Sequence, residues 1–259
     1  MRTLVTMAMV MLATPYYATI AIIASVLGLK NTPGSVLDQA PTRWARALLR
    51  AAGVRVVVHG AEQMQTGEPR IFASNHVSWF DVLALASILP RYKFVGKAEL
   101  TRVPLFGKAA VATAMIPIER ENRKAAFGSY DAAAKQIQAG TSVAVFPEGT
   151  RGPSYSLRPF KKGPFVLAVA AGVPVVPTIV HGTIHVNPRG SLRARSGVVH
   201  VHFLEPVPTE GLAYDDRDAL ARTVWTRMAE AMRDIYGVAS EPLRPPNERP
   251  TDRSSARAS

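Results

Sequence analysis

The sequence of 259 residues contains no cysteine. This absence excludes disulfide bonds, a thiolate nucleophile and zinc sites built on cysteine. Acidic residues are also scarce, because 19 Asp and Glu stand against 31 Lys and Arg, which gives a formal net charge of +12. A strongly basic surface favours anionic partners such as nucleic acid, anionic lipid headgroups or phosphorylated small molecules.

Charged side chains are missing between Arg2 and Lys30. As one helix this segment would be about 40 Å long, whereas the hydrocarbon core of a bilayer is roughly 30 Å thick. Residues 1–30 are therefore expected to form a membrane helix or, because of Pro15, a kinked helix or a hairpin within one leaflet. A cleaved signal peptide is the alternative, although no small-residue cleavage site precedes Lys30. The basic residues from Lys30 onward predict that the main domain lies on the cytoplasmic face of the cell membrane.

Two further segments flank the expected main domain. Residues 31–52 are interpreted as a linker and a basic amphipathic helix over 42–52, with Trp44 on its apolar face. Such a helix suits a membrane surface, and packing onto the domain is the alternative. Residues 239–259 are rich in Pro, Arg and Ser and are expected to form a disordered tail.

Short apolar runs alternate with helical patterns over residues 53–238, which predicts an α/β domain with a mostly parallel central sheet flanked by helices. The expected strands cover residues 55–59, 70–74, 92–95, 114–118, 143–146, 175–180 and 198–203. The expected helices cover residues 81–89, 123–139, 164–171 and 216–235.

The segment from Asn75 to Asp81 directly follows an expected strand, where α/β folds place their active sites. Asp81 lies five positions after His76, so the carboxylate can reach the imidazole across a loop and one helical turn. An Asp bonded to one ring nitrogen orients the imidazole and leaves the other nitrogen free to act as a base. A helix cap with an incidental histidine is the alternative interpretation.

A second charged turn follows the strand expected at 143–146, in the string Phe-Pro-Glu-Gly-Thr-Arg at residues 146–151. Arg is well suited to bind phosphate, and Gly149 would let the backbone approach a ligand closely. A surface turn with a structural Glu–Arg pair is the alternative. Lys97 and Arg120 also follow expected strands, so further cations are predicted at the same edge of the sheet.

The ordered blocks Asn-His-x4-Asp, Gly-Lys-x-Glu-Leu, Ile-x-Arg, Phe-Pro-Glu-Gly-Thr-Arg and Val-Pro-Val-Val-Pro, over about residues 70–180, resemble the glycerolipid acyltransferase family. The likeness is strongest to the 1-acylglycerol-3-phosphate acyltransferases. It implies that His76 is the general base and that Asp81 orients it. It also implies that the acceptor and its phosphate are bound by a set of six residues: Lys97, Arg120, Glu148, Gly149, Thr150 and Arg151.

The resemblance implies transfer of a fatty acyl group from acyl-CoA or acyl carrier protein to a lysophospholipid at a membrane, giving phosphatidic acid. Glycerol 3-phosphate or another lysolipid is the alternative acceptor. The sequence has no cysteine and no Gly-x-Ser-x-Gly motif, so direct transfer without an acyl-enzyme is expected, with no cofactor. The anionic substrates account for the positive charge, so no nucleic-acid partner is expected.

Two other classes of protein compete with this interpretation. A metal hydrolase would use histidines at metal-ligand spacing, either His181 with His185 or His200 with His202. The first pair lacks the Glu of a His-Glu-x-x-His site, so no metal site is predicted. A binding module that docks on anionic membrane or nucleic acid would explain the charge, but it leaves the ordered blocks unexplained.

Overall fold

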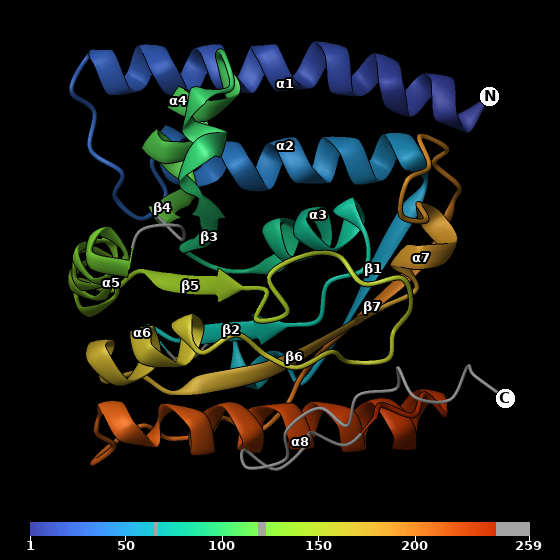
Figure 1. Ribbon diagram of the computed structural model, residues 1–259. Coiled ribbons are helices and arrows are strands. Elements are labelled where there is room, and N and C mark those ends of the chain that lie inside the picture. Colours follow the sequence, from blue (N-terminus) through green and yellow to red (C-terminus); the bar gives the residue numbers. More distant parts are fainter. Residues whose placement is uncertain (65–66, 119–122, 242–259) are drawn as a thin grey trace, which may run out of the picture.

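The computed structural model describes residues 1–64, 67–118 and 123–241. Within them a seven-stranded sheet has the order β1-β7-β6-β2-β5-β3-β4 (Figure 1). Its strands are β1 Val54–His59, β2 Ile71–Ser74, β3 Tyr92–Lys97, β4 Met115–Ile118, β5 Ser142–Val145, β6 Val175–His181 and β7 Gly197–Phe203. Neighbouring strands are parallel except β6 and β7, so the carboxyl ends of β2 to β6 share one edge of the sheet.

Helices cover both faces of the sheet (Figure 1). They are α1 Arg2–Val26, α2 Val36–Ala52, α3 Trp79–Ile88, α4 Phe106–Thr113, α5 Arg123–Gln138, α6 Gly163–Ala171, α7 Thr183–Val186 and α8 Arg217–Tyr236. The apolar core on one face joins the sheet to α2 and α3, and the core on the other face joins it to α5, α6 and α8. The predicted α/β class with a mostly parallel sheet is confirmed.

The central strands are buried on both sides, which explains their continuous apolar runs. All four residues of β2 are buried, with Phe72 in the core under α2 and α3 and Ile71 in the core under α8. The strands begin and end within two residues of the predicted ranges. Helix α2 begins six residues earlier than expected, where the Ser35 side chain accepts a hydrogen bond from the Asp38 backbone N–H and caps the helix.

Helices α4 and α7 were not predicted. Helix α4 lies among glycines and prolines that usually interrupt helices, and it is held by packing against α1, where Ala109 joins a small apolar cluster. Helix α7 has only four residues, too few to show a helical period. These two helices therefore lack the local pattern on which a prediction from periodicity depends.

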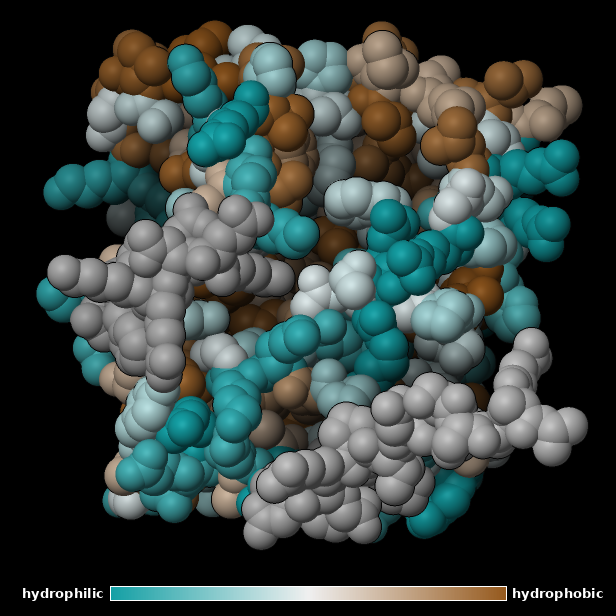
Figure 2. All heavy atoms as spheres, viewed as in Figure 1, coloured by the Kyte–Doolittle hydropathy of each residue, from teal (hydrophilic) through white to brown (hydrophobic). Residues whose placement is uncertain are grey.

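Helix α1 is continuous through Pro15, so neither a break nor a hairpin occurs there. It is the one helix in the described part of the chain that is long and apolar enough to cross a membrane. Small buried residues (Ala13, Ala18, Ala21 and Ala24) face the domain, and large apolar side chains face outward. Figure 2 shows apolar residues gathered over this helix.

Helix α2 lies between α1 and α3, and Trp44 at its middle donates its indole N–H to Thr14 Oγ1 of α1 at 3.1 Å (Figure 1). Helix α1 therefore covers the Trp44 side of α2. Of the two interpretations of this helix, packing against the rest of the protein describes the Trp44 side. The predicted tail lies largely outside the described residues, because 242–259 are not among them.

Candidate active site

The loop between β2 and α3 brings His76 and Asp81 into contact. The His76 Nδ1 and Asp81 Oδ2 atoms are 2.9 Å apart, and the side chains are 13% and 0% exposed. Ser78 is the N-cap of α3 and Asp81 is the third residue of the helix, where the two form a capping box. The Asp81 carboxylate thus caps α3 and also holds the His76 imidazole. The segment is therefore both a helix cap and a His–Asp pair, which the sequence had presented as alternatives.

Asp81 accepts four hydrogen bonds. Besides His76, its Oδ2 accepts the backbone N–H groups of Val77 at 2.6 Å and Ser78 at 2.8 Å, and its Oδ1 accepts the hydroxyl of Thr183 at 2.5 Å. Because the carboxylate is fully buried and anchored from both oxygens, its position is set before any substrate arrives. It therefore orients the His76 ring and leaves Nε2 as the nitrogen for a reacting group.

Two neighbouring elements fix the loop that carries His76. The buried Asn75 side chain accepts the Val180 N–H of β6 at 2.8 Å and donates to the Val180 carbonyl at 3.0 Å. The His76 ring stacks on Phe146 at the end of β5, with the ring centroids 4.0 Å apart. These contacts tie the β2 loop to both strands that flank β2.

Glu148 binds the backbone of the same loop. Its Oε1 accepts the His76 N–H at 3.0 Å, and its Oε2 accepts the Arg158 Nε–H at 3.0 Å. The Gly152 N–H donates to the His76 carbonyl at 2.7 Å, so the loop after β5 holds both backbone groups of His76. Only 1% of the Glu148 side chain is exposed, and both carboxylate oxygens are engaged within the protein.

Gly149 forms the turn after Glu148 with a φ of +80°, in the left-handed region that favours glycine. Its N–H donates to the Phe146 carbonyl at 3.0 Å. That N–H is therefore already engaged within the turn.

The predicted cationic residues occupy different positions around this site. The Arg151 guanidinium lies 5.1 Å from the ring centroid of Trp79, which is 57% exposed at the start of α3. Among the described residues no carboxylate forms an ion pair with Arg151. Lys97 is exposed at the carboxyl end of β3, and β5 separates that strand from β2. Thr150 is exposed and its carbonyl accepts a hydrogen bond from Arg158. Arg120 lies outside the described residues.

Sequence reasoning did not identify Thr183 or the role of Arg158. Thr183 lies 102 residues from Asp81 and shares no local motif with it. The available signal was topological: Thr183 follows β6, which is the neighbour of β2 and ends at the same edge of the sheet. Arg158 lies ten residues after Glu148 in a loop without a regular pattern, and it is the ionic partner of this buried carboxylate.

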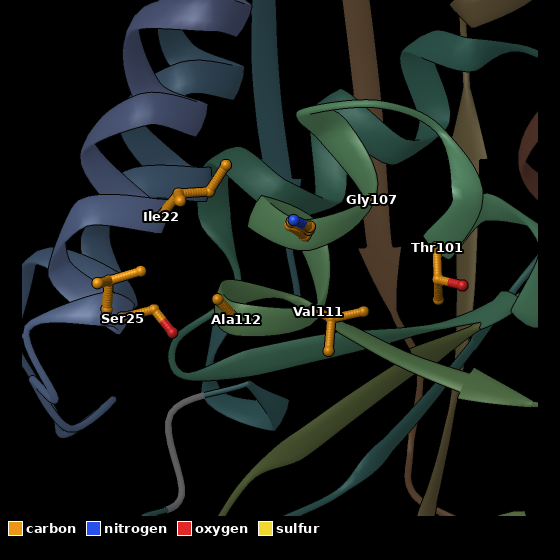
Figure 3. Close-up of a pocket in the computed structure, with 8 residues that line it drawn as sticks. Ile22, Ser25, Thr101, Gly107, Val111 and Ala112 are labelled. Carbon is orange, nitrogen blue, oxygen red and sulfur yellow. The ribbon is translucent and has the colours of Figure 1, made fainter.

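A groove of about 400 Å³ lies between α1 and α4, and none of the predicted site residues lines it. Figure 3 shows Ile22 and Ser25 of α1 on one side, Val111 and Ala112 of α4 next to them, and Thr101 beyond. This groove is an apolar recess beside the outward-facing side of α1, separate from His76.

Comparisons with known proteins agree with the order of the motifs. A family model described as Acyltransferase matches residues 55–181. A 1-acyl-sn-glycerol-3-phosphate acyltransferase of Haemophilus influenzae is 31% identical over 184 residues, which are 69% of this chain and 75% of that protein. The human 1-acyl-sn-glycerol-3-phosphate acyltransferase alpha is 37% identical over 185 residues, 71% of this chain and 65% of the human protein. The match thus spans just under two thirds of the human relative's length.

A solved structure extends the likeness to the fold. The crystal structure of the 1-acyl-sn-glycerophosphate acyltransferase from Thermotoga maritima superposes with a TM-score of 0.76 and covers 93% of this chain and 97% of that chain. The sequence identity is 24%, so this likeness concerns the shared fold.

Proposed function

The chain belongs to the acyltransferase family that includes the 1-acyl-sn-glycerol-3-phosphate acyltransferases, and on this premise we propose that it acylates the free hydroxyl of 1-acylglycerol 3-phosphate. The observation that carries the proposal is the contact of 2.9 Å between His76 and the buried Asp81 at the carboxyl edge of the sheet. The donor is an acyl thioester, acyl-CoA or acyl carrier protein, and the products are phosphatidic acid and a free thiol.

His76 acts as the general base in this proposal. Asp81 holds Nδ1, so Nε2 accepts the hydroxyl proton while the hydroxyl oxygen forms a bond to the thioester carbonyl carbon. The tetrahedral intermediate then collapses, the C–S bond breaks, and the proton passes from Nε2 to the leaving thiolate. A positioned base of this kind contributes about 10²–10⁴-fold to the rate.

Direct transfer is consistent with the side chains available. The sequence contains no cysteine, and no Gly-x-Ser-x-Gly motif supplies a serine nucleophile. The imidazole has one anchored and one free nitrogen, which suits proton transfer. We therefore propose a ternary complex in which the thioester and the acceptor meet at His76, without an acyl-enzyme and without a cofactor.

The acceptor phosphate is assigned to the cationic side chains around the site. Arg151 has no carboxylate partner among the described residues and lies over the exposed Trp79 ring, which leaves its N–H groups for a phosphate. Lys97 at the end of β3 and Arg120, whose structure is not described, complete the proposed set. Glu148 has both oxygens engaged within the protein, so we assign it to holding the His76 loop rather than to contact with substrate.

Helix α1 supplies the proposed attachment to the membrane. It packs lengthwise on the domain through small residues such as Ala18 and Ala21, and its outer side exposes Leu4, Met11 and Leu12. A helix that lies along the domain with one apolar side outward suits a position in one leaflet, parallel to the surface. The substrate hydroxyl then reaches His76 from the lipid headgroups on the cytoplasmic face.

The test is thiol release from palmitoyl-CoA with 1-oleoylglycerol 3-phosphate, using purified full-length protein in lipid. Because the chain contains no cysteine, a thiol reagent reports only the product. His76→Ala is expected to lower kcat about 10²–10⁴-fold with an unchanged melting temperature. The matched control is His185→Ala, which removes an exposed histidine of α7 and should leave kcat unchanged.

Two outcomes would contradict the proposal. A His76→Ala variant that keeps more than about a tenth of wild-type kcat would refute the base assignment. The second outcome concerns the acceptor. If the protein acylates glycerol 3-phosphate faster than 1-oleoylglycerol 3-phosphate at equal concentrations, the acceptor assignment is wrong, although the acyl-transfer mechanism still holds.

A further inference from the structure

Three histidines outside the candidate active site lie together on one face of the sheet. His59 ends β1, and His200 and His202 lie two residues apart on the adjacent parallel strand β7. His59 is directly opposite His202 in the strand register, so all three side chains leave the same face. This is the α8 face, because the alternate residues Val199, Val201 and Phe203 belong to the core under α2 and α3.

The ring nitrogens of these histidines converge. One nitrogen from each ring lies within 4.8 Å of the other two, and His59 Nε2 is 3.0 Å from His200 Nδ1. The His59 and His202 rings are stacked with their centroids 4.1 Å apart. Two imidazole nitrogens that face each other at 3.0 Å bind one proton between them, and a metal ion can replace that proton.

The surroundings orient the His202 ring. Its Nε2 is 2.7 Å from the hydroxyl of Tyr236, the last residue of α8, and the Tyr236 ring stacks on His181 at 3.7 Å between centroids. Hydrogen bonds to the second ring nitrogen are typical of metal-binding histidines, because they fix the orientation of the ring.

We propose that His59, His200 and His202 form a binding site for a divalent transition-metal ion, with Zn²⁺ as the best-suited ion. Imidazole ligands favour zinc, copper and nickel over magnesium and calcium, which require oxygen ligands. Tetrahedral zinc with Zn–N bonds of about 2.0–2.1 Å separates its ligand nitrogens by about 3.3 Å. To reach that spacing the stacked His59 and His202 rings must tilt so that the ion lies in the plane of each ring, and the exposed side of His59 leaves a fourth position for water.

This proposal does not depend on acyl transfer. A bound ion would join the edge strand β1 to β7, and through His202 and Tyr236 it would also support the end of α8. The ion is therefore expected to stabilise the fold rather than to take part in chemistry at His76. Removal of metal by a chelator should lower the melting temperature and leave kcat at moderate temperature unchanged.

The experiment titrates Zn²⁺ into chelator-treated full-length protein without a polyhistidine tag, by calorimetry at pH 7.5, and records the absorption spectrum of bound Co²⁺. One equivalent should bind, and Co²⁺ should show the intense visible bands of tetrahedral coordination. His200→Ala should weaken Zn²⁺ binding by at least about a hundredfold and abolish those bands, and Tyr236→Phe should weaken binding about tenfold. His185→Ala and His76→Ala are the matched controls and should bind as wild type does.

Equal Zn²⁺ affinity in His200→Ala and wild type would overturn the proposal, as would the absence of binding to the wild-type protein. His200→Gln keeps the size and polarity of the side chain, so it replaces His200→Ala if the alanine variant does not fold. Wild-type affinity in a folded His200→Gln protein would equally reject the site. A binding loss confined to His76→Ala would place the ion at the dyad instead and would also reject it.

Discussion

The hydrogen bond from Thr183 to Asp81 provides the sharpest test of how the candidate dyad is positioned. The two oxygens are 2.5 Å apart and both residues are fully buried. In the described part of the chain, Thr183 is the only donor to Asp81 Oδ1, because the other three bonds go to Oδ2. Thr183→Val has nearly the same shape and removes the hydroxyl that donates this hydrogen bond.

The expected magnitude follows from the charge of the acceptor. A hydrogen bond to a buried charged group contributes about 1.5–3 kcal/mol, and its loss leaves a carboxylate oxygen without a partner. Thr183→Val should therefore lower the free energy of unfolding by about 2 kcal/mol, measured by urea denaturation. If the same energy is lost from the orientation of His76, kcat falls by about 10–150-fold. KM should stay unchanged, because Thr183 is not proposed to contact either substrate.

Thr183→Ser is the matched control, since it keeps the hydroxyl and removes one buried methyl group. It should lose about 0.8 kcal/mol of stability and retain most of the wild-type kcat. Wild-type kcat in Thr183→Val would show that Asp81 needs no support from α7. A Thr183→Ser variant as slow as Thr183→Val would assign the effect to packing instead of hydrogen bonding.

Three other perturbations have defined outcomes. Arg151→Ala should raise the acceptor KM more than the donor KM in the thiol-release assay, and equal increases would argue for a structural role. Arg158→Met should lower the free energy of unfolding, measured by urea denaturation, by about 3 kcal/mol or less, because Glu148 loses its ionic partner. An unchanged free energy of unfolding would refute the importance of this pair. Arg2→Cys and Leu29→Cys place single thiols at the two ends of α1 in the cysteine-free chain, and both should react with an impermeant maleimide from the side of sealed vesicles on which acyl-CoA is consumed. Protection of one end until the vesicles are opened would show that α1 spans the bilayer.

Much of the fold was accessible from local sequence. Strands buried on both faces appear in the sequence as short runs of β-branched residues. One of them, Val175–His181, was predicted to within one residue. The position of His76 directly after a strand also followed from local pattern, because β2 ends at Ser74. The five-residue spacing predicted a contact with Asp81, and that contact forms. These features depend on alternation, loop length and capping, which neighbouring residues encode.

The resemblance to the acyltransferase family came from ordered motifs rather than from periodicity. The blocks around His76 and Arg151 follow in the order of the family, and the comparisons established membership in that family. The roles of the individual residues remain predictions, including those of Lys97 and Arg120.

Sequence alone established the apolar N-terminal helix, the alternating elements and the His76–Asp81 spacing, because each depends on residues that are close along the chain. Only the tertiary structure shows which distant residues complete the site. The strand order places β6 and β5 on either side of β2. It therefore brings Thr183 to Asp81 and Glu148 to the His76 backbone. The same holds for the histidine cluster, which requires β1 to pair with β7 across 141 residues of chain between His59 and His200. Strand pairing at such separations is decided by burial of the whole sheet between two helical layers, and no local pattern records it.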